Sequence, residues 1–346
     1  MLRLLSAFLL VSLPLVCATA IAKPDRLFAS HDPIEITLSA PFRSLSRDRD
    51  DEPQDRPATL RYEVDGEAHS VAIGIRPRGK SRRDRSVCNF PPLRLNLPKA
   101  DVKGTLFAKQ DKLKLVTHCK SMQSYQQYVL REYLAYRMFN LLTEASFKVR
   151  LLTVNYVDED RNGKVTTRLG FIIEHKKRVA RRLDADLIEV RRVERAKLEP
   201  AAASLAELYQ FLISNTDFSF IAGPANDRCC HNVVPFATAV GTVIPVPYDF
   251  DVSGLVDAPY ALPQENLKQR NLKDRLFRGF CRPPPHLDNA VARARSSRDE
   301  MYALINDLDG LNEKSQRQLT RFIDGFYQIL DEPARYEQRI AGACRG

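Results

Sequence analysis

The first half of the chain alternates between apolar and polar positions, which is the pattern of strands with one buried face. Asp65-Gly66 and Asn162-Gly163 each separate two such runs, and a dipeptide of this type between alternating runs is a β-hairpin signal. The pattern therefore predicts a mostly antiparallel sheet, with strands at 34–38, 59–64, 69–75, 93–97, 113–115, 151–157 and 165–173.

Helical periodicity interrupts this sheet once and then dominates the second half. The segment 121–142 has apolar residues at helical spacing, and Ser121 or Ser124 can cap its start. After residue 176 the chain becomes polar and basic, which marks a boundary. Further helices are predicted at 202–213, 287–308 and 313–330, the last of them capped by Asn312.

A sheet crossed by one helix and followed by a helical half is the plan of kinase-like folds. We therefore expect an α+β protein with a two-lobed protein-kinase-like fold. The antiparallel β N-lobe with its one helix would span 23–176, and the mainly helical C-lobe would span 177–346.

The amino terminus has the three parts of a secretory signal peptide. A short basic start at 1–3 precedes an almost wholly apolar run at 4–16, and Ala18-Thr19-Ala20 is an A-x-A cleavage pattern. This run is too short to span a bilayer, and no later apolar run is longer. We expect residues 1–22 to be removed and the protein to be periplasmic or secreted, with no integral membrane segment.

Removal of the signal leaves an even number of cysteines, which favours disulfides in an oxidising compartment. The sequence does not choose among the pairings, but adjacent Cys229 and Cys230 are expected to bond to different partners. The alternative is a zinc site formed by His118, Cys119 and the Cys229-Cys230-His231 run, although it lacks any C-x-x-C spacing.

The formal net charge is +10, and basic residues are clustered at 76–85, 176–182 and 191–197. Such clusters attract phosphate, acidic lipid headgroups or nucleic acid. No aromatic residue is interleaved in them, as a platform for stacking bases requires. Nucleic acid is therefore not an expected partner.

The candidate chemistry is concentrated between residues 212 and 261. Two short apolar runs on either side of Gly241 predict a hairpin that carries Asn232 at its entry and Asp249 and Asp251 at its exit. Carboxylate and amide oxygens are hard ligands that suit Mg²⁺ or Mn²⁺. We expect these three residues to bind a divalent metal, with Asp217 at the end of a predicted helix as the catalytic residue.

These residues resemble the spore-coat CotH-like atypical kinases. The specific motifs are Asn-Thr-Asp at 215–217, His-Asn at 231–232, and Tyr-Asp-Phe-Asp at 248–251 followed by Ser253-Gly254. A weaker likeness extends upstream to 76–81 and to the strand that ends at Glu174. The resemblance implies transfer of phosphate from ATP, with Glu174 near the adenine or ribose of the nucleotide.

The spacing departs from that of protein kinases, which place the catalytic Asp and the following Asn five residues apart. Here an insertion with a cysteine pair separates Asp217 from Asn232, whereas Asp227 lies five residues before Asn232. Asp227 therefore competes with Asp217. We favour Asp217 because it ends a helix pattern, as the family's Asp does.

Phosphate contacts are expected from the first half of the chain. In kinases a Lys on a strand pairs with a Glu on the helix and contacts phosphates. Lys112 and Lys114 precede the predicted helix, and Glu132 lies within it; we select Lys114 and Glu132. Arg78 and Arg94 are further candidates, because an Arg can hold a phosphate with two hydrogen bonds.

The leading hypothesis is an exported phosphotransferase, dependent on ATP and a divalent metal, that acts on a hydroxyl of an unidentified protein or envelope component. One alternative is a catalytically inactive module that binds an anionic cell-envelope partner in its basic cleft. Another is a metal-dependent phosphoesterase that uses the same carboxylates. The combination of Asp217, Asn232, Asp249 and Asp251 favours an enzyme, since a binding module does not need all four.

Overall fold

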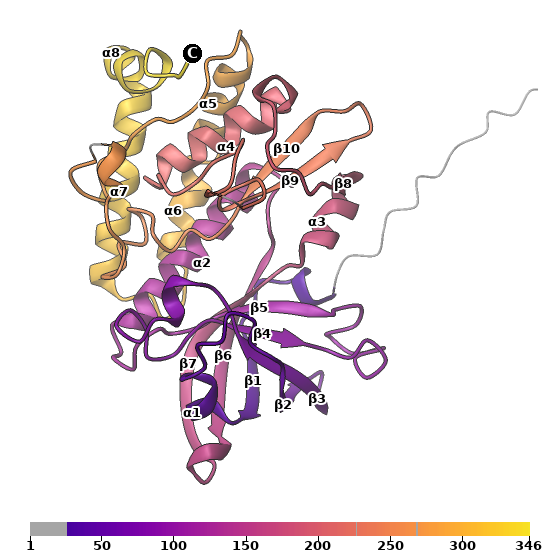
Figure 1. The fold of residues 1–346 in the computed structure, drawn as a ribbon. Helices are drawn as coiled ribbons and strands as arrows, with labels where there is room; N and C mark the ends of the chain where they lie inside the picture. The colour runs from indigo at the N-terminus through magenta and orange to yellow at the C-terminus, as the bar shows by residue number, and fades with distance from the viewer. Residues whose placement is uncertain (1–25, 226, 268) are drawn as a thin grey trace, which may run out of the picture.

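The computed structural model describes residues 26–225, 227–267 and 269–346, so the expected signal peptide at 1–22 lies outside the described residues. A β-barrel forms one end of the molecule and most of the helices form the other (Figure 1). None of the helices within the described ranges has the length and apolar character needed to cross a membrane.

Seven strands form the barrel in the order β1-β2-β3-β4-β5-β7-β6. The two predicted hairpins are confirmed, and Asp65-Gly66 and Asn162-Gly163 turn with positive φ at both residues, as such tight turns require. The strands are β1 Ile34–Ala40, β2 Arg56–Val64, β3 Glu67–Pro77, β4 Leu93–Asn96, β5 Lys112–Val116, β6 Val149–Asp158 and β7 Lys164–Ile173.

The predicted fold class is wrong, because the sheet closes on itself. We expected an antiparallel sheet with one helix as the N-lobe of a two-lobed kinase-like fold, in which the sheet is open. Instead β1 pairs antiparallel with β2 on one edge and parallel with β6 on the other, from Ile34 opposite Leu152 to Ala40 opposite Asp158. Alternation along a strand shows which side chains face inward, but it does not show which strand lies along each edge.

The barrel encloses its own apolar core. Each strand from β1 to β6 contributes at least two inward-facing side chains to this core, and β7 contributes Ile172. Examples are Ile36, Leu60, Ile73, Leu95 and Leu113. The polar positions between them face outward. The apolar and polar positions that alternate in the sequence therefore correspond to the inside and the outside of a closed barrel.

A second core holds the helices together. Helix α2 (Tyr125–Leu142) contacts β6 and β7 of the barrel and also α6, so it connects the two parts. The helix predicted at 287–308 is two helices, which meet at the buried Ser297. The remaining helices are α1 Phe42–Leu45, α3 Lys176–Arg182, α4 Pro200–Leu212, α5 His286–Ser296, α6 Arg298–Asn306, α7 Glu313–Asp331 and α8 Pro333–Tyr336.

A three-stranded sheet lies beside these helices. The predicted hairpin is confirmed as β9 (Val233–Thr238) and β10 (Val243–Pro247), and β8 (Ala185–Leu187) pairs with the outer edge of β9. Asn312 caps α7 as predicted, since its side chain accepts a hydrogen bond from the Ser315 amide at 2.8 Å.

Three disulfides join the cysteines of the described chain, which confirms the expected oxidation and fits an oxidising compartment. Cys88 bonds to Cys119 and Cys281 to Cys344. The expectation that Cys229 and Cys230 have different partners is wrong: they bond to each other, with Cα atoms 3.0 Å apart. Because these sulfur atoms are in disulfides, they do not supply thiolate ligands for the alternative zinc site.

Candidate functional site

Asp217 lies at the centre of a hydrogen-bonded cluster. Helix α4 ends at Leu212, and Ser214 then adopts a positive φ of 51°. Asn215 Oδ1 accepts a hydrogen bond from the Asp217 amide at 3.0 Å, which forms a tight turn. This turn places the Asp217 carboxylate beside the segment that enters β9.

His231 and Asn232 contact Asp217 directly. His231 Nε2 lies 2.7 Å from Asp217 Oδ1, and Asn232 Nδ2 donates to Asp217 Oδ2 at 2.9 Å and to its backbone carbonyl at 2.8 Å. The hydrogen bond to Asp217 raises the pKa of His231 above its ordinary value. The structure therefore brings Asp217 and Asn232 together despite the insertion between them.

The insertion is fixed at its end by the vicinal disulfide. The Cys229 amide donates to the Val190 carbonyl at 2.8 Å, and the next two residues are His231 and Asn232. Asp227, the competing aspartate, is on the surface, where its carboxylate is 3.5 Å from Lys80 Nζ and its side chain is 57 % exposed. Asp227 therefore lies in a solvent-exposed loop, where it pairs with Lys80.

Arg82 joins three buried or half-buried acids. It lies in a short 3₁₀ turn after β3, and its guanidinium is 3.4 Å from Glu132, 3.7 Å from Asp249 and 3.3 Å from Asp251. Glu132 comes from α2, and the two aspartates follow β10. The partner of Glu132 in this structure is thus Arg82 and not the expected Lys114.

Burial sets the protonation of these acids. It raises the pKa of Glu132 to about 8, against the opposing charge of Arg82, and it also raises the pKa of Asp251. Burial acts on Asp249 in the same direction, but Arg78, Arg82 and Lys114 outweigh it and lower the pKa of Asp249. Asp249, whose side chain is 33 % exposed, is therefore the carboxylate that stays ionised and accessible.

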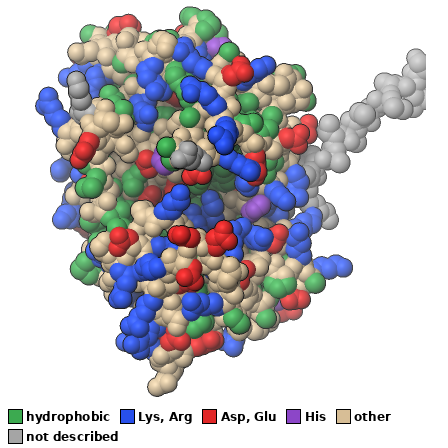
Figure 2. Space-filling view, in the orientation of Figure 1, with side chains coloured by type: hydrophobic (Ala, Val, Ile, Leu, Met, Phe, Trp, Pro, Cys, Tyr) green, Lys and Arg blue, Asp and Glu red, His purple; other side chains and the backbone are tan. Residues whose placement is uncertain are grey.

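Cations from the barrel face these acids. Arg76 of β3, Arg94 of β4 and Lys114 of β5 are opposite one another in register, so they form a row on the outside of the barrel. Lys114 Nζ lies 4.2 Å from the centre of the Tyr248 ring, next to Asp249. Burial, together with the charge of Arg78, lowers the pKa of Lys114 to about 7. Figure 2 shows Lys and Arg side chains around the hollow between the barrel and the helices.

Glu174 is not part of this cluster. It is buried at the end of β7, where its carboxylate accepts hydrogen bonds from Arg182 at 2.6 and 2.9 Å and from the Lys148 amide at 3.1 Å. These contacts hold α3 against the end of the barrel. The carboxylate is satisfied within the protein, which does not favour the expected contact with a nucleotide.

The predicted metal ligands fit a divalent ion in part. Arg82 pairs more closely with Asp251, at 3.3 Å, than with Asp249, at 3.7 Å, which leaves Asp249 and the Oδ1 atom of Asn232 as the more available oxygens. Mg²⁺ is commonly held by one or two protein carboxylates with the remaining positions taken by water and phosphate. Within the described residues there is no cluster of three or more His, Cys, Asp or Glu side chains placed to hold a metal. A divalent ion here would have Asp249 as a protein carboxylate ligand, and its remaining positions would be open to water and phosphate.

Two residues of the site were missed from the sequence. Arg82 lies within the basic run 76–85, where a buried arginine has no signal that distinguishes it from its exposed neighbours. His231 was considered as a zinc ligand and as part of the His-Asn motif, but it was given no role beside Asp217. Its position directly before Asn232 was the available signal for a contact with Asp217.

Comparison with protein-family models finds none that matches this chain, and comparison with curated proteins finds no match either. The likeness to the CotH-like kinases therefore depends on the motif residues between 215 and 251.

Proposed function

We propose that this protein is a phosphotransferase that uses ATP with Mg²⁺ or Mn²⁺ and transfers phosphate to a hydroxyl acceptor, as the resemblance to the CotH-like atypical kinases implies. The observation that carries the proposal is the position of Asp249. Its carboxylate lies 3.7 Å from the Arg82 guanidinium, and the charges of Arg78, Arg82, Lys114 and His231 all lower its pKa. An anionic ligand and a metal ion would both be stabilised between these groups.

Each group has a part in this proposal. Lys114, Arg78 and Arg94 bind the phosphates, and a planar guanidinium can do so with two hydrogen bonds. Asp249 and Asn232 Oδ1 hold the metal ion, which neutralises phosphate charge when it is bound.

Asp217 orients the acceptor hydroxyl and takes its proton. Its side chain is 28 % exposed, so an acceptor can reach it. His231 and Asn232 hold the carboxylate in place. Phosphoryl transfer depends mainly on positioning and charge stabilisation, and a site of this kind does not require an open sheet beneath it.

The second candidate is a binding module without catalysis. It is favoured by Arg82, which pairs with Asp251, an expected metal ligand, and with Glu132, the expected partner of Lys114. Such a module would hold a phosphate-bearing partner against the same row of cations.

Calorimetry with ATP tests the proposal. The parent protein should bind ATP with Mg²⁺ or Mn²⁺ more tightly than without metal, and Lys114→Ala should weaken binding by about tenfold or more. Arg321→Ala, an exposed arginine of α7, is the matched control and should bind as the parent does. If the parent binds no nucleotide with either metal, the phosphotransferase proposal fails and the binding module replaces it.

A further inference from the structure

A second cavity lies on the barrel, beside the loop that carries Arg78 and Arg82. It measures about 320 Å³, and its walls come from α1, from the segment around Phe90, from His118 and from the β6–β7 hairpin. The Cys88–Cys119 disulfide ties two of these walls together, and the Phe90 amide donates to the Cys119 carbonyl at 2.9 Å. The cavity is thus held by covalent and backbone bonds.

Aromatic rings form one side of this cavity. Phe90 stacks on His118 with ring centres 4.6 Å apart, and Tyr156 meets Phe90 edge-on at 4.9 Å. Phe42 of α1 contacts Tyr156 at 5.2 Å. A ligand with a flat or ring-shaped body can pack against such a surface.

Two residues of the cavity wall each carry a buried polar atom that has no hydrogen-bond partner. Among the described residues, neither Nδ1 of His118 nor the hydroxyl of Tyr156 has a hydrogen-bond partner, although the two residues are only 5 % and 2 % exposed. Burial lowers the pKa of His118 to about 4, so its ring is neutral near pH 7 and carries one N–H. Buried polar groups in proteins nearly always have partners, so a ligand that reaches these two atoms through a small side-chain shift would satisfy them.

The charge of the cavity is strongly positive. Four arginines line it, against one acid, Asp158, which pairs with Arg161 at 3.5 Å. Arg47 and Arg85 have no acidic side chain within ion-pair distance in the described part of the chain. These two guanidinium groups are free to bind an anion.

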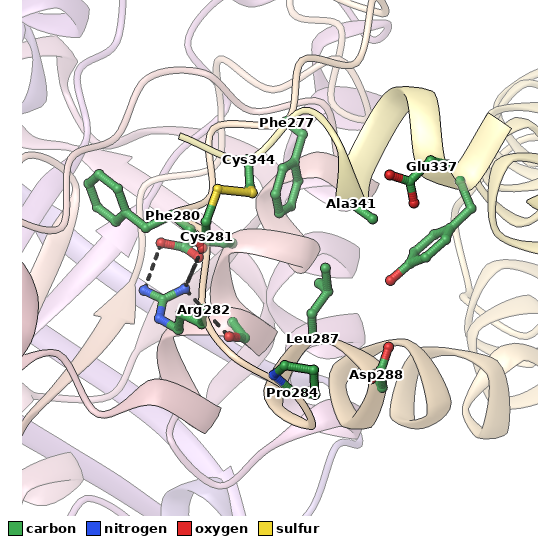
Figure 3. A pocket seen from close by; sticks show the side chains of 13 residues that line it. Phe277, Phe280, Cys281, Arg282, Pro284, Leu287, Asp288, Glu337, Ala341 and Cys344 are labelled. Carbon is green, nitrogen blue, oxygen red and sulfur yellow. Dashed lines mark hydrogen bonds and ion pairs between the residues drawn. A yellow bond between two sulfur atoms is a disulfide. The ribbon is translucent and has the colours of Figure 1, made fainter. Parts of the chain in front are cut away.

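The cavity beside the Cys281–Cys344 disulfide lacks these features. Arg282 is fully paired there with Glu207, and two other acids, Asp288 and Glu337, also line it (Figure 3). Its lining carries three acids against one arginine, so it has no comparable preference for an anion.

We propose that the cavity between α1 and Phe90 binds a small ring-bearing phosphate monoester. Arg47 and Arg85 bind the phosphate, the aromatic side holds the ring, and Tyr156 and His118 hydrogen-bond to its polar substituents. The ring comes from a phosphorylated sugar or from an aromatic phosphate, which share this chemistry. The site is separate from the proposed phosphotransferase centre and does not depend on it.

Calorimetry at low ionic strength tests this site, with glucose 6-phosphate, phenyl phosphate and inorganic phosphate as probes. We expect one of the two ring phosphates to bind at least tenfold more tightly than inorganic phosphate, and the comparison of the two identifies the ring. Arg85→Ala should weaken that binding about tenfold, while Arg321→Ala, which removes the same charge from α7, should not.

Tyr156→Phe separates ligand binding from folding. Because the hydroxyl has no protein partner, the variant should melt at the parent temperature in the absence of ligand and bind the ring phosphate several-fold more weakly. Lys114→Ala should leave this affinity unchanged, which distinguishes the site from the ATP centre. Equal affinity for inorganic phosphate and both ring phosphates, or equal effects of Arg85→Ala and Arg321→Ala, would overturn the proposal.

Discussion

At the scale of single residues, Arg82 balances carboxylates that come from two distant parts of the chain. Its side chain is 7 % exposed and lies within 3.4 Å of both Glu132 and Asp251. Removing one partner of such a group leaves uncompensated buried charge, which typically costs roughly 3–5 kcal/mol. Arg82→Met should therefore lower the free energy of unfolding by about that amount in urea titrations.

The matched control for this change is Arg321→Met. That arginine is exposed on α7, and a surface substitution is expected to stay within about 0.5 kcal/mol of the parent. A loss below about 1 kcal/mol for Arg82→Met would mean that the acids are neutralised by protons without the arginine.

Glu132 makes stability depend on pH. Burial raises its pKa from 4.5 to about 8, so the folded protein keeps a proton that the unfolded chain releases above about pH 4.5. The folded state binds more protons in this window, and the contribution of Glu132 to the free energy of unfolding falls as pH rises from about 4.5 to about 8. Relative to Glu132→Gln, the parent should lose up to a few kcal/mol across that range.

Urea unfolding at several pH values measures this difference. Glu52→Gln on an exposed loop is the control, and its free energy of unfolding should change with pH as that of the parent does. A parent that gains stability over Glu132→Gln as pH rises would show that pairing with Arg82 outweighs burial.

Asp217 and Asp249 have different roles in the proposed reaction, and substitution separates them. Asp217→Asn should leave ATP and metal binding nearly intact but lower turnover by roughly the 10²–10⁴-fold typical of a lost general base. Asp249→Asn should abolish the metal-dependent part of ATP binding, because it removes the ionised oxygen ligand.

Phosphate transfer from labelled ATP and calorimetry provide the two readouts. Asp227→Asn is the control, since Asp227 pairs with Lys80 on the surface and should have little effect. Inactivation by Asp227→Asn with full activity in Asp217→Asn would mean that the five-residue kinase spacing was the better guide.

At the scale of elements, the sequence predicted most strands and helices but not which of them pair or pack together in space. Turn dipeptides located the hairpins, and the Asn312 cap located the start of α7. The break at Ser297 was missed because the apolar spacing continues across it, and no Pro or Gly marks the end of α5. The contact between Asp217 and Asn232 depends on the β9–β10 hairpin and on the path of the loop between these two residues. Local sequence patterns do not predict that path.

The vicinal disulfide belongs to this scale, because it precedes the two residues that hold Asp217. Changing Cys229 and Cys230 together to Ser should loosen the loop and lower phosphate transfer by about tenfold. It should reduce stability only slightly, since a bond between neighbours closes almost no chain. Transfer assays and thermal melting measure the two effects, and full activity in the double variant would contradict the positioning role.

At the scale of the whole molecule, Cys281–Cys344 ties the carboxyl terminus to the loop before α5. Its cysteines are 63 residues apart, and closing a loop of that length is worth roughly 4 kcal/mol by the chain-entropy relation. Cys281→Ser with Cys344→Ser should therefore lower the free energy of unfolding far more than the Cys229 and Cys230 double variant. Equal losses in the two double variants would contradict an origin in loop closure.

The closed barrel could not be predicted at this scale, since it depends on one pairing between distant segments. Hairpin signals report strands that are adjacent in sequence, and β1 and β6 are not. Parallel pairing also has no short turn between the strands to reveal it. The alternating pattern fits an open sheet and a barrel equally well.

That parallel pairing has a consequence for the order in which the chain emerges during synthesis. The partner of β1 on one edge, β2, is synthesised within a few tens of residues after β1. The partner on its other edge, β6, is synthesised much later. An unpaired strand edge is a template for pairing with other chains. Nascent or truncated chains that end before residue 149 would therefore carry an unpaired edge on β1. A chaperone would have to shield this edge until β6 is present and the barrel can close.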